Sequence, residues 1–233
     1  MKLSIEDLGI AGADEISMTH WNGLLARHPR TGAEYAILPT QEHGFVAVQP
    51  HAGTSVHVRP DLACYERTSR GAAQSPDGNL YLFGFRSGQC YAPKKSWSLL
   101  RWDWEPDHLP EPVLDGTAGI YTCLHMAFAE DGRLYVSNED RLYRMDVAKQ
   151  ETVSLASGIR CMQYNQRDRH LYCLTDGRID AIDSRTDKAT PVPLPPEAVR
   201  AGFLHRDGAG RVILMFDADQ RDGETFWLEL MEG

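Results

Sequence analysis

Short stretches of alternating apolar and polar residues, separated by turn residues, run through most of this chain. The alternation is typical of half-buried strands, and no stretch longer than about ten residues keeps the period of an amphipathic helix. One unit recurs, an Asp-Gly turn followed by an apolar strand with tyrosine in its second position. Its clearest copies start at Asp77-Gly78 and at Asp131-Gly132, and a third copy at Asp168 lacks the glycine. The pattern predicts an all-β chain of repeated hairpins.

A second apolar strand, ending in aspartate, follows each copy at residues 99–103, 142–146 and 179–183. An early hairpin with the turn Pro29-Arg30-Thr31-Gly32 is similar to a later one with the turn Ser184-Arg185-Thr186-Asp187. Equivalent positions recur about every 40 residues, which is the length of one four-stranded propeller blade. The recurring Tyr81, Tyr135 and Tyr172 are expected to pack between blades.

We therefore predict a β-propeller of four-stranded blades that fills residues 1–233 as a single domain. Six blades fit the length best, and five are the alternative. The expected blades are 1–38, 39–69, 70–117, 118–158, 159–199 and 200–233. Because the last repeat supplies only three strands, Lys2 to Leu8 is expected to close the ring as the missing outer strand. Closure by a second chain is the other possibility.

The Asp-Gly turn, the Leu-Tyr strand and the Leu-Tyr-Arg-x-Asp strand at 142–146 resemble the repeats of two propeller groups. These are the NHL propellers and the SMP-30-like, or gluconolactonase-like, propellers. The resemblance covers residues 41–217, concerns the fold unit alone and implies a six-bladed fold. The metal-binding carboxylates of the gluconolactonase group cannot be placed on residues of this chain, so the resemblance assigns no active site.

The chain carries a formal net charge of -9, which argues against a general nucleic-acid-binding surface. No apolar run approaches the roughly 20 residues of a membrane-spanning helix, and the acidic N-terminus is unlike a secretory signal. A cytoplasmic protein that binds neither nucleic acid nor membrane is expected. The five cysteines include no CxxC pair, so we expect buried thiols, and neither a metal site nor a cofactor is predicted.

Candidate ligand-binding residues lie on the strands that precede the Asp-Gly turns and that would line the central channel. Arg70, Arg160 and Arg200 occupy matching places there, and Tyr121 takes this place in the remaining blade. Arginine binds carboxylates, sulfates and phosphates through its planar guanidinium. The set therefore predicts a site for an anionic small molecule or a uronic-acid sugar.

Candidate catalytic residues lie on the same strands. His125 and His205 are possible general acids or bases near neutral pH, and Tyr164 is a possible proton donor. Together with arginine they are suited to β-elimination at a uronate. The structural alternative is that the arginines form ion pairs with Asp103, Asp146 and Asp183 of neighbouring blades, and that the histidines belong to the core.

The segment 87–97 is predicted to be an insertion loop that exposes Tyr91 and Trp97 to a sugar or a partner protein. The sequence leaves two hypotheses for the function. The first is a binding module that presents the channel mouth and this loop to a protein partner or an anionic ligand. The alternative is an enzyme, a lyase or a lactone or sugar hydrolase, that acts on an anionic carbohydrate at the channel mouth.

Overall fold

Antiparallel strands make up the regular structure of the described residues, as the sequence predicts. The computed structural model describes residues 24–39, 45–49, 54–58, 67–86, 96–105, 107–116, 120, 123, 125–138, 140–176, 178–194, 203–206, 211–217 and 225–230. Nineteen strands and no helix occur within these ranges. Accordingly, no helix in this part of the chain is long and apolar enough to span a membrane.

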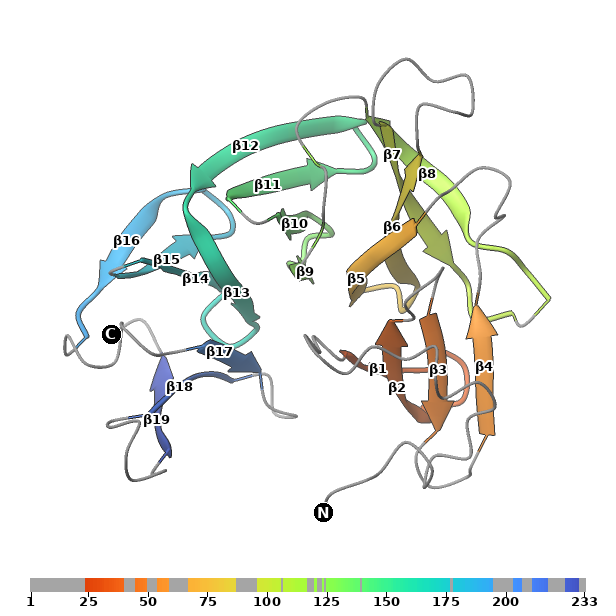
Figure 1. Ribbon diagram of the computed structural model, residues 1–233, viewed down its shortest axis with the longest axis horizontal. Helices are drawn as coiled ribbons and strands as arrows, with labels where there is room; N and C mark the ends of the chain where they lie inside the picture. Colours follow the sequence, from red (N-terminus) through yellow and green to blue (C-terminus); the bar gives the residue numbers. More distant parts are fainter. Residues whose placement is uncertain are drawn as a thin grey trace. The chain divides into compact units, whose positions relative to one another are not determined.

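The described chain divides into two compact units, residues 1–124 and 125–233. The first unit holds two four-stranded sheets whose strands pair in chain order (Figure 1). They are β1 (Leu24–Arg27), β2 (Glu34–Pro39), β3 (Phe45–Gln49) and β4 (Thr54–Val58), followed by β5 (Arg67–Gln74), β6 (Leu80–Arg86), β7 (Ser96–Trp102) and β8 (Glu111–Gly116).

The second unit holds two further four-stranded sheets and one three-stranded sheet, again paired in chain order. The strands of the four-stranded sheets are β9 (His125–Phe128), β10 (Leu134–Ser137), β11 (Arg141–Asp146), β12 (Glu151–Ser157), β13 (Ile159–Asn165), β14 (His170–Thr175), β15 (Ile179–Asp183) and β16 (Ala189–Val192). The last sheet contains β17 (Phe203–Arg206), β18 (Val212–Asp217) and β19 (Thr225–Leu230).

The Asp-Gly turns lie where the repeat predicts them, between the first and second strands of a sheet. Gly78 and Gly132 adopt positive φ angles of 90° and 83°, which favour glycine. In the copy without glycine, Arg169 takes the same conformation with φ 63°. Each hairpin is thus closed by one residue in the left-handed region.

One predicted blade boundary is wrong. Residues 24–58 form one sheet, in which β2 pairs with β3 from Ala36↔Val48 to Pro39↔Phe45. The expected division between residues 38 and 39 therefore falls inside a sheet. The described residues contain five sheets in all.

Within each unit, buried apolar side chains pack between successive sheets. Tyr81, Tyr135 and Tyr172 are 7%, 0% and 0% exposed, so the prediction that they pack in the interior is confirmed. Cys123, Cys161 and Cys173 are buried thiols, as expected, and burial raises the pKa of each. Cys64 and Cys90 lie outside the described residues.

Candidate functional site at the start of the first strands

Arg160 lies in a β-bulge at the start of β13. Ile159 pairs with Thr175 and Cys161 pairs with Leu174, so Arg160 is the extra residue between two consecutive pairs. A bulge of this kind redirects a side chain away from the sheet. The Arg160 side chain is accordingly 46% exposed, between two buried neighbours. The sequence therefore predicted the position of this arginine but not the backbone irregularity that exposes it.

Arg70 occupies the matching place in the first unit. The ladder between β5 and β6 also shifts register, between Thr68 and Ala72, and Arg70 falls within this irregular stretch. Arg70 lies three residues before Ala73, which pairs with Tyr81. Arg160 likewise lies three residues before Gln163, which pairs with Tyr172. The backbone irregularity is thus part of the repeat. The side chain of Arg70 lies outside the described part of the structure.

His125, the first residue of β9, supports the backbone at Arg160. Its ring is hydrogen-bonded to the backbone of Arg160, which lies on β13, the first strand of the next sheet. Burial lowers the pKa of His125 to about 4, and the hydrogen bond offsets this only in part. The imidazole is therefore neutral near pH 7 and fixes the position of the bulge. The structure thus brings together two of the predicted residues, His125 and Arg160.

The ionic partner of Arg160 is Asp176, which the sequence analysis did not single out. Arg160 Nε lies 3.5 Å from Asp176 Oδ1, in the turn between β14 and β15. The three aspartates proposed as structural partners pair instead within their own turns. Asp103 contacts His108 at 2.9 Å, Asp146 contacts Lys149 at 2.6 Å, and Asp183 contacts Arg185 at 3.3 Å. Arg160 therefore forms an ion pair with an aspartate, as the structural alternative expects, but with Asp176 rather than with one of these three aspartates.

Tyr164 lies too far from Arg160 to act with it. The two residues are four positions apart on β13, which corresponds to about 13 Å along an extended strand. Tyr164 is 1% exposed, within a core that includes Met162 and Leu171. Burial raises its pKa, and the nearby Ser184 hydroxyl and Glu130 backbone offset this only in part. The expected grouping of arginine, histidine and tyrosine is therefore absent around Arg160.

Trp97 is not an exposed aromatic residue. It belongs to β7, pairs with Phe85 and Gly116, and is 3% exposed. Its ring packs against Phe83, with 5.2 Å between the ring centroids. A Cβ atom at residue 116 would collide with the indole, so the glycine provides the space that buries it. The prediction that Trp97 contacts a ligand or partner is therefore wrong.

The remaining predicted residues cannot be placed. Tyr91, Tyr121 and Arg200 lie outside the described residues. His205 lies on β17, but its side chain is not among those described. Within the described ranges, no group of three or more histidine, cysteine, aspartate or glutamate residues has an arrangement that could hold a metal ion.

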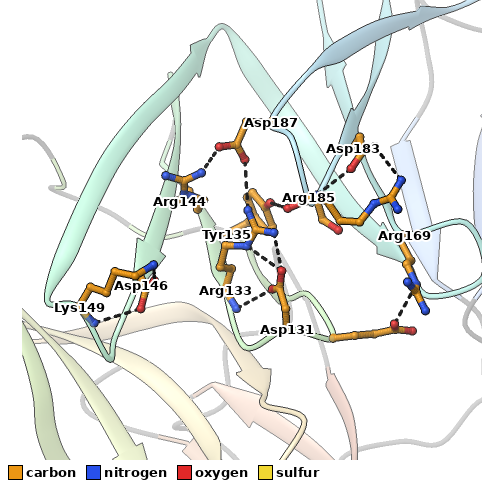
Figure 2. Close-up of polar contacts among 12 residues, drawn as sticks. Asp131, Arg133, Tyr135, Arg144, Asp146, Lys149, Arg169, Asp183, Arg185 and Asp187 are labelled. Carbon is orange, nitrogen blue, oxygen red and sulfur yellow. Dashed lines mark hydrogen bonds and ion pairs between the residues drawn. The ribbon is translucent and has the colours of Figure 1, made fainter.

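At the opposite end of β13, a charge network joins two neighbouring sheets (Figure 2). Asp187, in the turn between β15 and β16, forms an ion pair with Arg144 of β11 and lies 4.0 Å from Arg133. Tyr135 donates a hydrogen bond of 3.3 Å to the backbone carbonyl of Ser184. Asp187 and Arg133 lie in turns, whereas Arg144 and Tyr135 lie on β11 and β10. Their contacts connect the sheet of β9–β12 to the sheet of β13–β16.

Asp187 makes a contact between sheets that the sequence pattern did not indicate. It has φ 59°, and the matching residue of the similar early turn is Gly32, with φ 71°. Aspartate adopts this conformation more readily than most residues, so the turn alone gives no sign of the ion pair.

Comparison with solved structures shows the fold. An auxiliary nutrient-binding protein from Bacteroides thetaiotaomicron matches 92% of this chain with a TM-score of 0.58 and 14% identity. Hydrazine synthase from Kuenenia stuttgartiensis matches 91% with a TM-score of 0.56 and 14% identity. The chain has the β-propeller fold. It spans 56% and 60% of the lengths of these two proteins.

Two further structures carry names related to carbohydrate chemistry. An oligogalacturonate lyase in complex with manganese matches 88% of the chain and 60% of its own, with a TM-score of 0.58 and 11% identity. A presumed gluconolactonase matches 88% of the chain and 71% of its own, with a TM-score of 0.52 and 14% identity. The fold-level resemblance to gluconolactonase-like propellers is confirmed. No protein-family model matches the chain, and no curated protein matches its sequence.

Proposed function

We propose that the protein is a binding module for an anionic small molecule, which binds at the start of the first strands. The observation that carries this proposal is the exposed Arg160 in its bulge. The backbone of Arg160 is hydrogen-bonded to the neutral ring of His125. In a propeller the first strands line the central channel, where ligands commonly bind. An exposed guanidinium at that place is suited to a carboxylate, sulfate or phosphate.

The enzyme alternative has weaker support from the geometry. An elimination reaction at a uronate needs a proton donor and a base close to the arginine. Tyr164 is buried at the other end of β13. His125, with a pKa of about 4, carries no acidic proton to donate near pH 7 and is a weak base. The names of similar structures include a nutrient-binding protein as well as a lyase. With Trp97 buried, the support for a protein partner at the insertion loop is also weaker.

The test is a thermal-shift screen of uronic acids, sugar phosphates and lactones with the wild-type protein and Arg160→Ala. A ligand at 100 times its Kd stabilises the folded state by about 2.7 kcal/mol. For a chain of this size, that corresponds to a rise in Tm of about 5 °C or more. We expect an anionic compound to raise the Tm of wild type and to have little effect on Arg160→Ala.

The matched control is Arg141→Ala. Arg141 is also an exposed arginine in the second unit, with an ion pair of 3.7 Å to Asp140. This variant should keep the full thermal shift. Equal loss of the shift in both variants, or a shift that survives in Arg160→Ala, would assign the ligand to another site. No shift with any anion would reject the proposal.

We also propose that the propeller has five blades and that Lys2 to Leu8 closes it by pairing with β19. The described residues form five sheets of three or four strands each. Leu228 of β19 is 40% exposed, whereas Leu99, Leu142 and Ile179, on the third strands of complete sheets, are 0% exposed. A fourth strand beside β19 accounts for this difference.

Deletion of residues 2–8 should lower the Tm by about 5 °C or more, because the proposed strand carries three apolar residues, Leu3, Ile5 and Leu8. Leu228→Ala should destabilise the full chain but have little effect in the deletion variant, since the two changes remove the same contact. The Tm values of wild type, the deletion variant, Leu228→Ala and the combined variant measure this coupling. Additive effects, or an unchanged Tm after the deletion, would contradict closure by this segment.

A further inference from the structure

We infer that Asp176 is a built-in competitor for the ligand, so that the site recognises a carboxylate. This inference rests on the proposed function. It starts from one contact: Asp176 Oδ1 lies 3.5 Å from Arg160 Nε and already places a carboxylate on the guanidinium. A ligand carboxylate has the same charge and shape, and it replaces Asp176 without any change in the arginine.

The turn that carries Asp176 allows this exchange. The backbone amide of Thr175 donates to the carbonyl of Arg178 at 3.0 Å, which closes the hairpin between β14 and β15 around Asp176. The Asp176 side chain is 88% exposed, whereas Arg160 is 46% exposed. The backbone of the turn is therefore held in place while the carboxylate is surrounded by solvent. Moving it away from Arg160 costs one weak, exposed ion pair and no change of fold.

The charge balance around Arg160 favours a carboxylate over a phosphate. Three arginines described at this end of the two sheets each have an aspartate partner. The three pairs are Arg141 with Asp140, Arg160 with Asp176, and Arg178 with Asp180. Displaced Asp176 stays on its turn and keeps its charge, so a bound carboxylate adds one uncompensated negative charge near these aspartates and a phosphate dianion adds two. The repulsion therefore opposes the phosphate more than the carboxylate.

The test measures binding by isothermal titration calorimetry, at low salt, with galacturonate, galactose and galactose 1-phosphate. The proteins are wild type, Arg160→Ala, Asp176→Asn and Asp140→Asn, each as the full chain. Asn-Gly forms the same tight turn as Asp-Gly, so Asp176→Asn should fold normally. Asp140→Asn removes a nearby negative charge that pairs with Arg141 and leaves the contact of Arg160 intact.

For Asp176→Asn we expect galacturonate to bind about 1.5- to 5-fold more tightly than to wild type, the range that an exposed ion pair provides. Asp140→Asn should bind like wild type, and galactose should not bind. If galacturonate binds wild type through Arg160 but binds Asp176→Asn no more tightly than it binds wild type or Asp140→Asn, competition by Asp176 is rejected. That result would leave the proposed binding function standing. Tighter binding of galactose 1-phosphate than of galacturonate overturns the carboxylate preference. If no anion binds in an Arg160-dependent manner, the proposed function fails as well.

Discussion

Replacement of Trp104 by alanine should lower the free energy of unfolding by about 3 to 5 kcal/mol, the range for truncating a buried tryptophan. Trp104 is 4% exposed, although it lies in the connection between β7 and β8. Its ring lies 5.2 Å from His28 and from Tyr35 and 5.5 Å from Trp102, measured between ring centroids. A loss of this size is a large part of the stability of an ordinary domain.

The indole of Trp104 also makes a hydrogen bond that alanine cannot replace. Its Nε1 donates to the backbone carbonyl of Gly78 at 2.8 Å, which joins the loop after β7 to the Asp-Gly turn before β6. Urea denaturation of the two proteins, compared at equal m-value, measures the difference. Leu109→Ala is the matched control, because Leu109 is 63% exposed and its truncation should change stability by about 0.5 kcal/mol or less.

The backbone at Trp104 provides a second comparison. Its φ of 72° is in the left-handed region, which is unfavourable for a bulky side chain. Glycine adopts this conformation without strain, so Trp104→Gly should be more stable than Trp104→Ala by about 1 kcal/mol. If Trp104→Ala lowers the free energy of unfolding by less than about 1 kcal/mol, the packing of Trp104 does not hold the sheet of β1–β4 against the sheet of β5–β8. Equal stability of the alanine and glycine variants would mean that the backbone relaxes once the ring is removed.

The sequence predicted the local hairpins well because their signals are local. The Asp-Gly turns at residues 77–78 and 131–132 mark where strands reverse, and the tyrosines that follow point into the core. The similarity of the turns at Gly32 and Asp187 is likewise confirmed by their shared positive φ. Turn chemistry and alternation both depend on a few adjacent residues, so they can be read from the chain itself.

The assignment of hairpins to sheets could not be predicted in the same way. The hairpin of β1 and β2 resembles that of β15 and β16, yet it begins a sheet rather than ending one. Which strand pairs with β2 is decided by contacts between segments that the repeat does not specify. Trp97 shows the same limit, because its burial depends on Gly116, across the sheet, whose absent side chain gives no hydrophobic signal.

The sequence singled out Arg160 but not the residue that pairs with it. Arg160 was identified because it recurs before each turn, whereas Asp176 is one acidic residue among many in an acidic chain. The bulge that exposes Arg160 leaves no mark in the hydrophobic pattern. It becomes visible only when the partners of Ile159 and Cys161 are known. Distances between turns of neighbouring strands therefore had to come from the structure.

Acidification should destabilise the wild-type protein more than a His125→Gln variant, by up to about 3 kcal/mol between pH 7 and pH 4. The pKa of His125 is lowered by burial from 6.5 to about 4 in the folded protein. Above pH 6.5 the imidazole is neutral in both the folded and the unfolded chain, so it contributes no pH dependence. As the pH falls from 6.5 to 4, the unfolded chain binds a proton at this residue and the folded chain does not, which favours unfolding.

Denaturant titrations of both proteins at several pH values isolate this contribution, because all other titrating groups are common to the two. Parallel pH profiles would show that His125 titrates normally and does not support Arg160 as a neutral donor. His125→Gln also tests the proposed anion site, because the imidazole of His125 is hydrogen-bonded to the backbone of Arg160. If His125 only positions the bulge, the Kd of wild type should not vary with pH between 5 and 8, and His125→Gln should show a higher Kd over the same range. A wild-type affinity that followed a pKa near 6.5, and lost this dependence in His125→Gln, would instead require a protonated His125 in contact with the ligand.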